Sequence, residues 1–142
     1  MPSEGGAGRE QWASAISRFD RDANRDSVHI EDLAQVRNVY PQDKYLGNYE
    51  TVAALAYRGH DLDGLREFAR RLAFTILIGN GDAHLKNWSL IYTDPRVPSL
   101  APLYHMVSTA YYLGARGTLG LNVGGPGRFD KVDVTPVARL QR

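Results

Sequence analysis

The clearest periodic pattern in the chain lies between residues 65 and 78. Apolar side chains recur there at the i, i+3, i+4 and i+7 spacing of an amphipathic helix, with charged residues on the other side. After Arg71 this polar face disappears, because Phe74, Leu77 and Ile78 make the last turns apolar all round. The pattern predicts a helix over 65–78 whose carboxyl-terminal end is buried and delivers the following loop to the floor of a cleft.

Two shorter helices are predicted upstream. Residues 30–36 have apolar positions at helical spacing and acidic residues in the first turn, and Pro41 is expected to end this helix. Asn48 is a suitable amino-terminal cap for a second helix over 49–56, which Gly59 is expected to stop.

A β-hairpin is predicted after residue 87. The apolar run 88–92 indicates a strand, residues 94–96 form a turn, and 97–100 return as the hairpin partner. Together with the helices, this hairpin predicts an α+β fold, mainly α, with a small β-sheet.

The remaining segments have weaker patterns. Residues 1–9 are rich in Gly, Ser, Pro and charge and are expected to be disordered, whereas 12–19 could form a short helix or a strand. In the tail we expect a strand around 119–123, a hairpin or loop at 124–127 and the beginning of a helix after Asp133.

Composition narrows the class of protein. The 142 residues are 43% hydrophobic and 23% charged, as in one ordinary globular domain, and the net charge of +1 gives no electrostatic case for direct contact with nucleic acid or an anionic membrane. The absence of cysteine excludes disulfides and thiolate metal clusters. The longest apolar run is too short to span a membrane and residues 1–8 do not resemble a signal peptide, so a cytoplasmic protein is expected.

One acidic segment imitates a calcium-binding loop. Five oxygen-bearing side chains fall on loop positions 1, 3, 5, 7 and 12, namely Asp20, Asp22, Asn24, Asp26 and Glu31. Position 6, where a calcium loop needs glycine for its sharp turn, is Arg25. An ordinary turn is therefore favoured, and a calcium site is the alternative.

The strongest chemical signal is the polar cluster over residues 79–87, which connects the predicted long helix to the hairpin. Asp82 and Asn87 stand five positions apart on this loop. Phosphoryl transfer from ATP needs a carboxylate that accepts or orients the proton of the attacking hydroxyl, and a nearby amide oxygen that helps to hold magnesium. A polar turn in which Asp82 caps a short helical turn is the alternative.

Five fragments of the chain, in their order, resemble the second half of HipA-type serine/threonine kinases, the toxins of bacterial toxin–antitoxin pairs. They are SRFDR at 17–21, HIEDLAQ at 29–35, KY at 44–45, IGNGDAHLKN at 78–87 and LAPLY at 100–104. The resemblance implies that residues 16–142 form the large lobe of a protein-kinase-like fold, truncated at both ends, and that 1–15 are disordered or the tail of a missing amino-terminal lobe.

The resemblance also implies an activity. The complete family member transfers the ATP γ-phosphate, with ATP and Mg²⁺ as cofactors, to a protein such as an aminoacyl-tRNA synthetase, and a small DNA-binding antitoxin is its partner. Asp82 is the expected catalytic base and Asn87 a magnesium ligand. His84 and Lys86 are expected to support the loop or the transferred phosphate.

His105 departs from the family pattern, which has a magnesium-binding aspartate at this position. Because an imidazole removes a negative charge and offers a nitrogen that magnesium does not favour, we expect this chain to be catalytically deficient. The alternatives are a non-catalytic lobe that binds an antitoxin or partner, a zinc or manganese hydrolase using Asp82, His84 and His105 with His29 or His60, and a histidine without a role. Neither a glycine-rich nucleotide loop nor an ATP-binding lysine is recognisable upstream.

Overall fold

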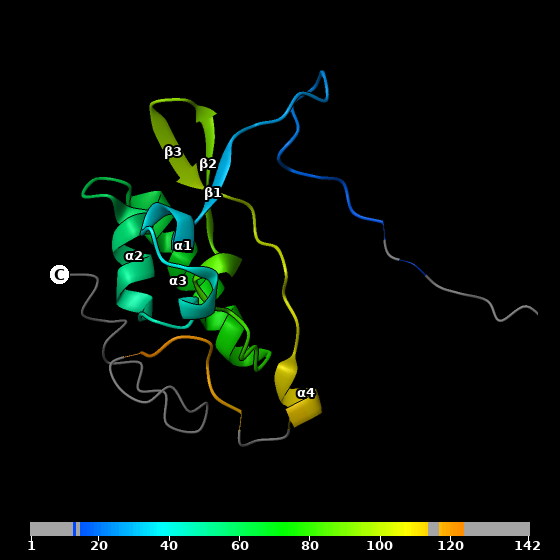
Figure 1. Ribbon diagram of the computed structural model, residues 1–142, viewed down its shortest axis with the longest axis vertical. Coiled ribbons are helices and arrows are strands. Elements are labelled where there is room, and N and C mark those ends of the chain that lie inside the picture. Colours follow the sequence, from blue (N-terminus) through cyan, green and yellow to red (C-terminus); the bar gives the residue numbers. More distant parts are fainter. Residues whose placement is uncertain (1–12, 14, 114–116, 124–142) are drawn as a thin grey trace, which may run out of the picture.

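The computed structural model describes residue 13, residues 15–113 and residues 117–123. In these residues a small sheet lies at one end of the molecule, three helices lie next to it, and a fourth helix lies at the other end (Figure 1). The elements are β1 (Ile30–Asp32), α1 (Leu33–Val36), α2 (Tyr49–Tyr57), α3 (Leu62–Leu77), β2 (Ser89–Asp94), β3 (Val97–Leu100) and α4 (Thr109–Leu113), with 3₁₀ turns at Pro41–Asp43 and Leu85–Asn87.

The sheet contains the predicted hairpin and one further strand. β2 and β3 pair antiparallel, with Leu90 opposite Leu100, which confirms the hairpin. β1 pairs antiparallel with the other edge of β2, with Ile30 opposite Ile91. The prediction that residues 30–36 are all helical was therefore wrong for the first three, because pairing with β2 satisfies their backbone groups in an extended conformation.

The first helix begins only at Leu33. The Asp32 carboxylate accepts a hydrogen bond from the Gln35 backbone N–H, and the Gln35 side chain accepts one from the Asp32 N–H, which together form a capping box. The helix ends at Val36, and Asn38 has a left-handed φ of 53°. Pro41 starts a 3₁₀ turn and does not end this helix as predicted.

The next two helices form a hairpin. Asn48 caps α2, as predicted, by accepting from the Thr51 N–H, and the chain leaves this helix through left-handed Arg58 and Gly59. α3 begins at Leu62, three residues before the predicted start at 65, because Asp61 accepts from the Gly64 N–H and caps it.

The carboxyl-terminal end of α3 is not buried on all sides, which corrects the sequence-based expectation. Phe74 is 45% exposed and Leu77 is 83% exposed, whereas Phe68, Leu72 and Thr75 face the core. The core covers only one side of this helix, so the apolar residues on its other side remain at the surface.

Trp88 lies in the middle of the core. Its ring centroid is 5.4 Å from that of Phe68 on α3 and 6.1 Å from that of Tyr49 on α2. Trp88, Tyr49 and Phe68 belong to one buried core whose other members come from the helices, the site loop, the sheet and the tail, namely Leu33, Ala34, Val52, Ala53, Ala56, Leu72, Leu85, Leu90, Leu119 and Leu121. The site loop, residues 79–87, is therefore attached to the core directly before Trp88.

Several weaker predictions have a different outcome. The described part of 12–19 contains neither a helix nor a strand, and at 119–123 Asn122 forms only an isolated bridge with Asn48. α4 was not predicted. Most of 1–15, the loop at 124–127 and the helix after Asp133 lie outside the described residues.

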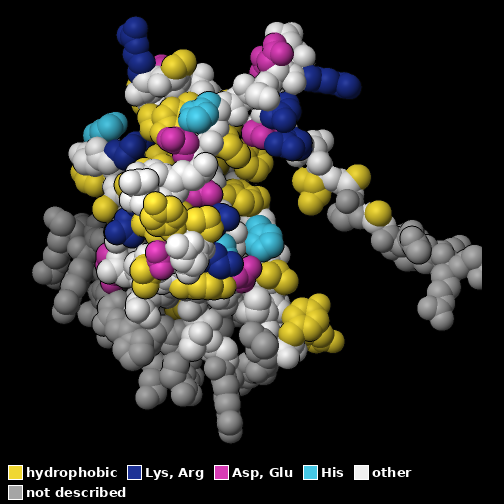
Figure 2. All heavy atoms as spheres, viewed as in Figure 1, with side chains coloured by type: hydrophobic (Ala, Val, Ile, Leu, Met, Phe, Trp, Pro, Cys, Tyr) yellow, Lys and Arg dark blue, Asp and Glu magenta, His cyan; other side chains and the backbone are white. Residues whose placement is uncertain are grey.

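The surface carries mixed charges. On the face shown in Figure 2, basic and acidic side chains are interspersed and hydrophobic side chains reach the surface between them. Among the described residues, no helix is both long enough and apolar enough to cross a membrane.

Candidate functional site

The site loop leaves α3 through two glycines that lie against α4 and the tail. Gly79 has a φ of 64°, and a Cβ placed on it would lie 2.5 Å from the Cβ of Ala110. The Thr109 hydroxyl donates to the Gly79 carbonyl at 3.0 Å and accepts from the Gly81 N–H at 2.7 Å. The first residue of α4 therefore fixes the start of the site loop.

Asn80 is fully buried and shapes the next turn. Its Oδ1 accepts from the Asp82 backbone N–H at 3.0 Å, and its Nδ2 contacts the sulfur of Met106 at 3.7 Å. A buried amide that contacts both segments fixes the backbone of Asp82 relative to residues 101–108.

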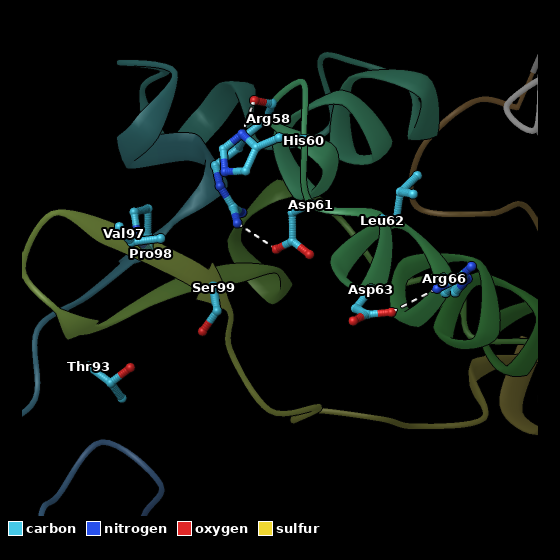
Figure 3. A pocket seen from close by; sticks show the side chains of 10 residues that line it. All are labelled: Arg58, His60, Asp61, Leu62, Asp63, Arg66, Thr93, Val97, Pro98 and Ser99. Carbon is cyan, nitrogen blue, oxygen red and sulfur yellow. Dashed lines mark hydrogen bonds and ion pairs between the residues drawn. The ribbon is translucent and has the colours of Figure 1, made fainter.

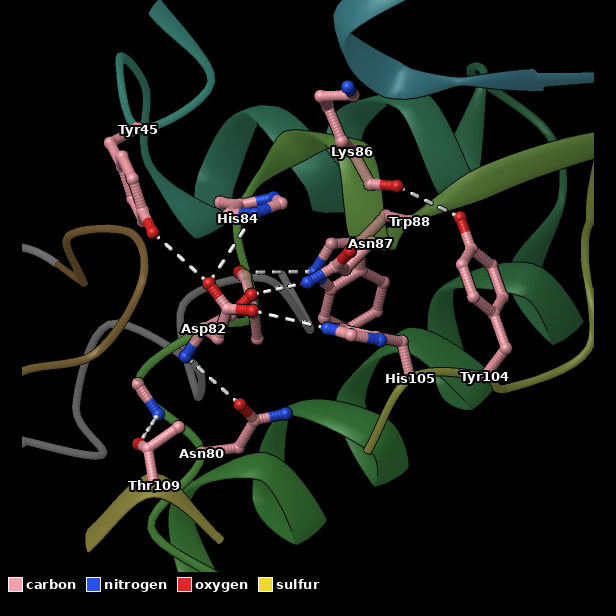
Figure 4. Close-up of polar contacts among 12 residues, drawn as sticks. Tyr45, Asn80, Asp82, His84, Lys86, Asn87, Trp88, Tyr104, His105 and Thr109 are labelled. Atoms are coloured by element: carbon pink, nitrogen blue, oxygen red, sulfur yellow. Dashed lines mark hydrogen bonds and ion pairs between the residues drawn. The ribbon is translucent and has the colours of Figure 1, made fainter. Parts of the chain in front are cut away.

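The Asp82 carboxylate is the centre of the site (Figure 4). Its Oδ1 accepts from the Tyr45 hydroxyl at 3.1 Å and lies 3.5 Å from His84 Nε2. Its Oδ2 lies 3.1 Å from His105 Nε2. Three side chains from three separate segments therefore converge on one carboxylate, which remains partly exposed.

This environment favours the ionised carboxylate. Burial raises the pKa of Asp82, but the hydrogen bonds from His105 and Tyr45 and the charges of His84 and Lys44 together lower it by more. The pKa therefore lies below its ordinary value. At neutral pH Asp82 is an anion able to accept a proton or to orient a hydroxyl.

His84 is buried beside Asp82. Burial and the charge of Lys44 lower the pKa of His84, whereas the charge of Asp82 raises it by less. Its Nδ1 has no hydrogen-bond partner among the described residues. We infer that the ring is neutral at neutral pH and supports the loop mainly by packing.

Asn87 and Lys86 occupy the 3₁₀ turn that ends the loop. The Asn87 amide nitrogen donates to the Asp82 backbone carbonyl, which closes the loop. The Lys86 side chain is exposed and points away from the Asp82 carboxylate (Figure 4). The structure thus brings Asn87 to the site but not the Lys86 ammonium.

His105 comes from the segment that follows β3, and its backbone is left-handed with a φ of 53°. The start of this segment is fixed by buried Arg71 on α3, which donates to the Ala101 carbonyl. Further along, the Tyr104 hydroxyl donates to the Lys86 carbonyl at 3.0 Å. These two anchors direct the His105 ring toward Asp82.

Sequence reasoning assigned no role to Lys44 and Tyr45, although both fall in the KY fragment of the family resemblance. The structure places them at the site. The Leu85 backbone N–H donates to the Lys44 carbonyl at 3.1 Å, which attaches this segment to the site loop. A tyrosine or lysine in a distant loop gives no local pattern from which such a contact could be predicted.

The sequence of almost the entire chain matches one family. The model of the HipA-like C-terminal domain matches residues 4–139. The chain belongs to this family.

Curated relatives of this HipA-like chain are considerably longer than it. It is 50% identical over 111 residues to "Putative kinase Y4dM" of Sinorhizobium fredii, covering 78% of this chain and 27% of the relative. It is 37% identical over 114 residues to a "Putative kinase" of Haemophilus influenzae, covering 72% of this chain and 33% of the relative. The HipA-like chain therefore spans about a third or less of the length of these proteins.

A solved structure shares the fold. The HipA-like chain superposes with a TM-score of 0.73 and 21% identity on a chain from the Shewanella oneidensis MR-1 toxin–antitoxin system, solved as a complex of HipA, HipB and operator DNA. The match covers 87% of this chain and 34% of that chain. At this identity the likeness establishes the fold.

The metal-dependent hydrolase alternative has no support in the HipA-like site. Within the described ranges, no group of three or more His, Asp or Glu side chains could hold a metal ion. His29 packs against the Tyr92 ring at 5.0 Å, and His60 Nδ1 contacts the Arg58 carbonyl at 2.9 Å. Neither histidine joins Asp82.

The calcium-loop alternative also lacks support among the described residues. The Asp20 carboxylate is bound by Arg18 and by Arg21, the latter at 3.1 Å. The Asp22 carboxylate accepts from the backbone N–H groups of Asn24 and Asp26 at 2.8 Å each. These bonds explain the acidic residues as parts of a turn.

One open depression of about 510 Å³ lies away from Asp82, between the α2–α3 connection and β3 (Figure 3). Two of its acidic residues are already paired with arginines, Asp61 with Arg58 at 2.6 Å and Asp63 with Arg66 at 2.9 Å. Of the residues named in the sequence-based hypotheses it contains only His60, a candidate ligand of the hydrolase alternative, and we assign no role to it.

Proposed function

We propose that this chain is part of a HipA-like protein kinase, that Asp82 is its catalytic base, and that His105 makes the chain deficient in phosphoryl transfer. The observation that carries the proposal is the contact between His105 Nε2 and Asp82 Oδ2 at 3.1 Å. In the family pattern described above, a metal-binding aspartate is expected at position 105. Here an imidazole contacts the candidate base directly.

The proposed role of Asp82 follows from its geometry. The carboxylate is ionised, partly exposed, and held by contacts to both of its oxygens. A serine or threonine hydroxyl that approaches it would donate a hydrogen bond and be oriented for attack on a γ-phosphate. Asn87 would hold the loop in this shape through the Asp82 carbonyl, and His84 would support it by packing.

Magnesium does not fit the residues present. A magnesium ion prefers several oxygen ligands, whereas the side chain at position 105 offers nitrogen, and that nitrogen contacts Asp82. We therefore assign no step in this chain to Mg²⁺, and the need for ATP and Mg²⁺ in the longer protein stays a proposal.

A second candidate function is a non-catalytic lobe that binds a partner. The same contact favours it, because an imidazole nitrogen already occupies the place of a metal at the Asp82 Oδ2 atom. The solved HipA neighbour, a complex with HipB and operator DNA, supports a small DNA-binding antitoxin as the partner. Contact with DNA would then be made through the antitoxin, and an aminoacyl-tRNA synthetase-like substrate would belong to an active family member.

Labelling with radioactive ATP tests the proposed deficiency. The purified chain, incubated with γ-labelled ATP and magnesium, should incorporate no label above a blank, because catalysis of phosphoryl transfer depends on positioning and charge neutralisation. Label that disappears in Asp82→Ala would show that the chain is an active kinase and would overturn the deficiency. A stable complex with a small DNA-binding protein, in the absence of labelling, would favour the non-catalytic candidate.

A further inference from the structure

Tyr45 contacts the candidate base, and no role described so far accounts for it. Its hydroxyl donates to Asp82 Oδ1 at 3.1 Å, although 37 positions separate the two residues. Its ring stands edge-on to the His84 ring, with 5.0 Å between the centroids. One side chain therefore contacts two residues of the site loop that carry a predicted role, Asp82 and His84.

The segment that carries Tyr45 is attached to the site loop by its own backbone. Leu85 donates its N–H to the carbonyl of Lys44, the residue directly before Tyr45. The Lys44 ammonium lies 5.0 Å from the centroid of the Tyr45 ring, at a distance suited to a cation–π contact. The ring thus contacts both Lys44 and His84, although the residue is 49% exposed.

A carboxylate needs two contacts to be held in one orientation. The Asp82 side chain can turn about its Cα–Cβ and Cβ–Cγ bonds, and the hydrogen bond that its backbone N–H donates to Asn80 fixes only the backbone. His105 contacts Oδ2 alone, and the His84 contact to Oδ1 is long at 3.5 Å. The Tyr45 hydroxyl supplies the short hydrogen bond to Oδ1, so the plane of the carboxylate is set by Tyr45 on one oxygen and His105 on the other.

We propose that Tyr45 is the positioning residue of this site, whose hydroxyl fixes the orientation of the Asp82 carboxylate toward an incoming hydroxyl group. The inference rests on the role proposed above for Asp82. Tyr45 acts through Asp82 and does not take part in proton transfer itself.

The test compares Tyr45→Phe with a matched control, Tyr40→Phe. Both substitutions remove one phenolic hydroxyl, and Tyr40 lies in the same connection between α1 and α2 but is 72% exposed. In the complete isotope-labelled chain at about pH 7, where aspartate is ionised, three-bond couplings report the χ1 rotamer of Asp82 and the carboxyl carbon shift reports its hydrogen bonds. We expect a single rotamer in the native chain and in Tyr40→Phe, and averaged couplings with a shifted carboxyl signal in Tyr45→Phe.

A rescue variant separates positioning from packing. Replacement of Tyr45 by 4-aminophenylalanine restores an N–H donor at the end of the ring, and it should restore the native couplings. Unchanged Asp82 signals in Tyr45→Phe would overturn the proposal. So would a Tyr45→Phe chain that does not fold, since a positioning role leaves the fold intact. These signals are independent of phosphoryl transfer, so failure of the labelling experiment and failure of this one are distinguishable.

Discussion

The Nε2 atom of His105 lies 3.1 Å from Oδ2 of Asp82, although 23 positions separate the two residues in the chain. The contact depends on a left-handed backbone at His105 and on the anchoring of residues 101–104 by Arg71 and by the Lys86 carbonyl. Position 105 therefore faces the candidate base, as expected for the second metal-ligand position of a kinase. The residue found there is an imidazole, and the following predictions test what it and its neighbours do.

Restoring a carboxylate at position 105 should create a magnesium site. We expect His105→Asp to bind Mg²⁺ at least about tenfold more tightly than the native chain, roughly 1.4 kcal/mol, because a second charge and a hard oxygen face Asp82. Calorimetric titration with magnesium, manganese and zinc measures this.

His29→Asp is the matched control, since it makes the same substitution at an exposed histidine directly before β1. No difference from the native chain for any of the three metals would show that position 105 is not part of a metal site. Weaker zinc binding in His105→Asp would instead support the hydrolase alternative.

His84 should make the stability of the chain depend on pH near neutrality. Burial lowers its pKa from 6.5 in the folded chain, so the unfolded chain binds the proton more readily. The contribution of neutral His84 to the stability of the fold is therefore complete above the pKa that His84 has in the unfolded chain. It is lost as the pH falls from there toward the lower pKa that His84 has in the folded chain. Urea unfolding, measured from about one pH unit above 6.5 to one below it, should show falling stability in the native chain and a flatter profile in His84→Gln.

The exposed histidine at position 60 provides the control for this profile. His60→Gln should keep the slope of the native chain. If His84→Gln and His60→Gln have equal slopes, the burial of His84 is not the cause of the pH dependence.

A side chain at position 79 should separate α4 from the site loop. Gly79→Ala would strain a left-handed backbone, at a cost of about 1 kcal/mol, and would also bring its Cβ to 2.5 Å from Ala110, at a further cost of about 1–3 kcal/mol. Gly59→Ala is the control, because its φ is also positive but a Cβ there meets nothing within 4 Å. If denaturant unfolding shows that Gly79→Ala and Gly59→Ala lose the same amount of stability, α4 does not pack on the site loop.

Loss of the Arg71 anchor should loosen the segment that carries His105. Arg71→Met leaves the Ala101 carbonyl without its donor and should cost about 1–3 kcal/mol of stability. Arg70→Met, on the exposed side of the same helix, should cost less than about 0.5 kcal/mol. Denaturant unfolding compares the two, and a loss in Arg71→Met no greater than in Arg70→Met would contradict the anchoring role.

Local sequence patterns determined much of the helical fold and the identity of the site loop. The amphipathic spacing after residue 65 and the Asn48 cap depend on neighbours within one or two turns, so they can be read from the sequence. The density of polar residues between Gly79 and Asn87 marked the site in the same way. The convergence of Asp82 and His105 followed from the family resemblance and was then found in the structure.

The tertiary structure alone decided the features that depend on distant residues. Residues 30–36 have the apolar spacing of a helix, but the backbone groups of Ile30–Asp32 pair with β2, about sixty residues further along the chain. The apolar end of α3 looked like core, yet Phe74 and Leu77 remain exposed because the core covers only one face of the helix. Tyr45 likewise reaches Asp82 because the Leu85 backbone N–H donates a hydrogen bond to the Lys44 carbonyl and so holds the Tyr45 segment against the site loop. Periodicity reports which face of a segment is apolar, whereas long-range pairing and packing decide what that face meets.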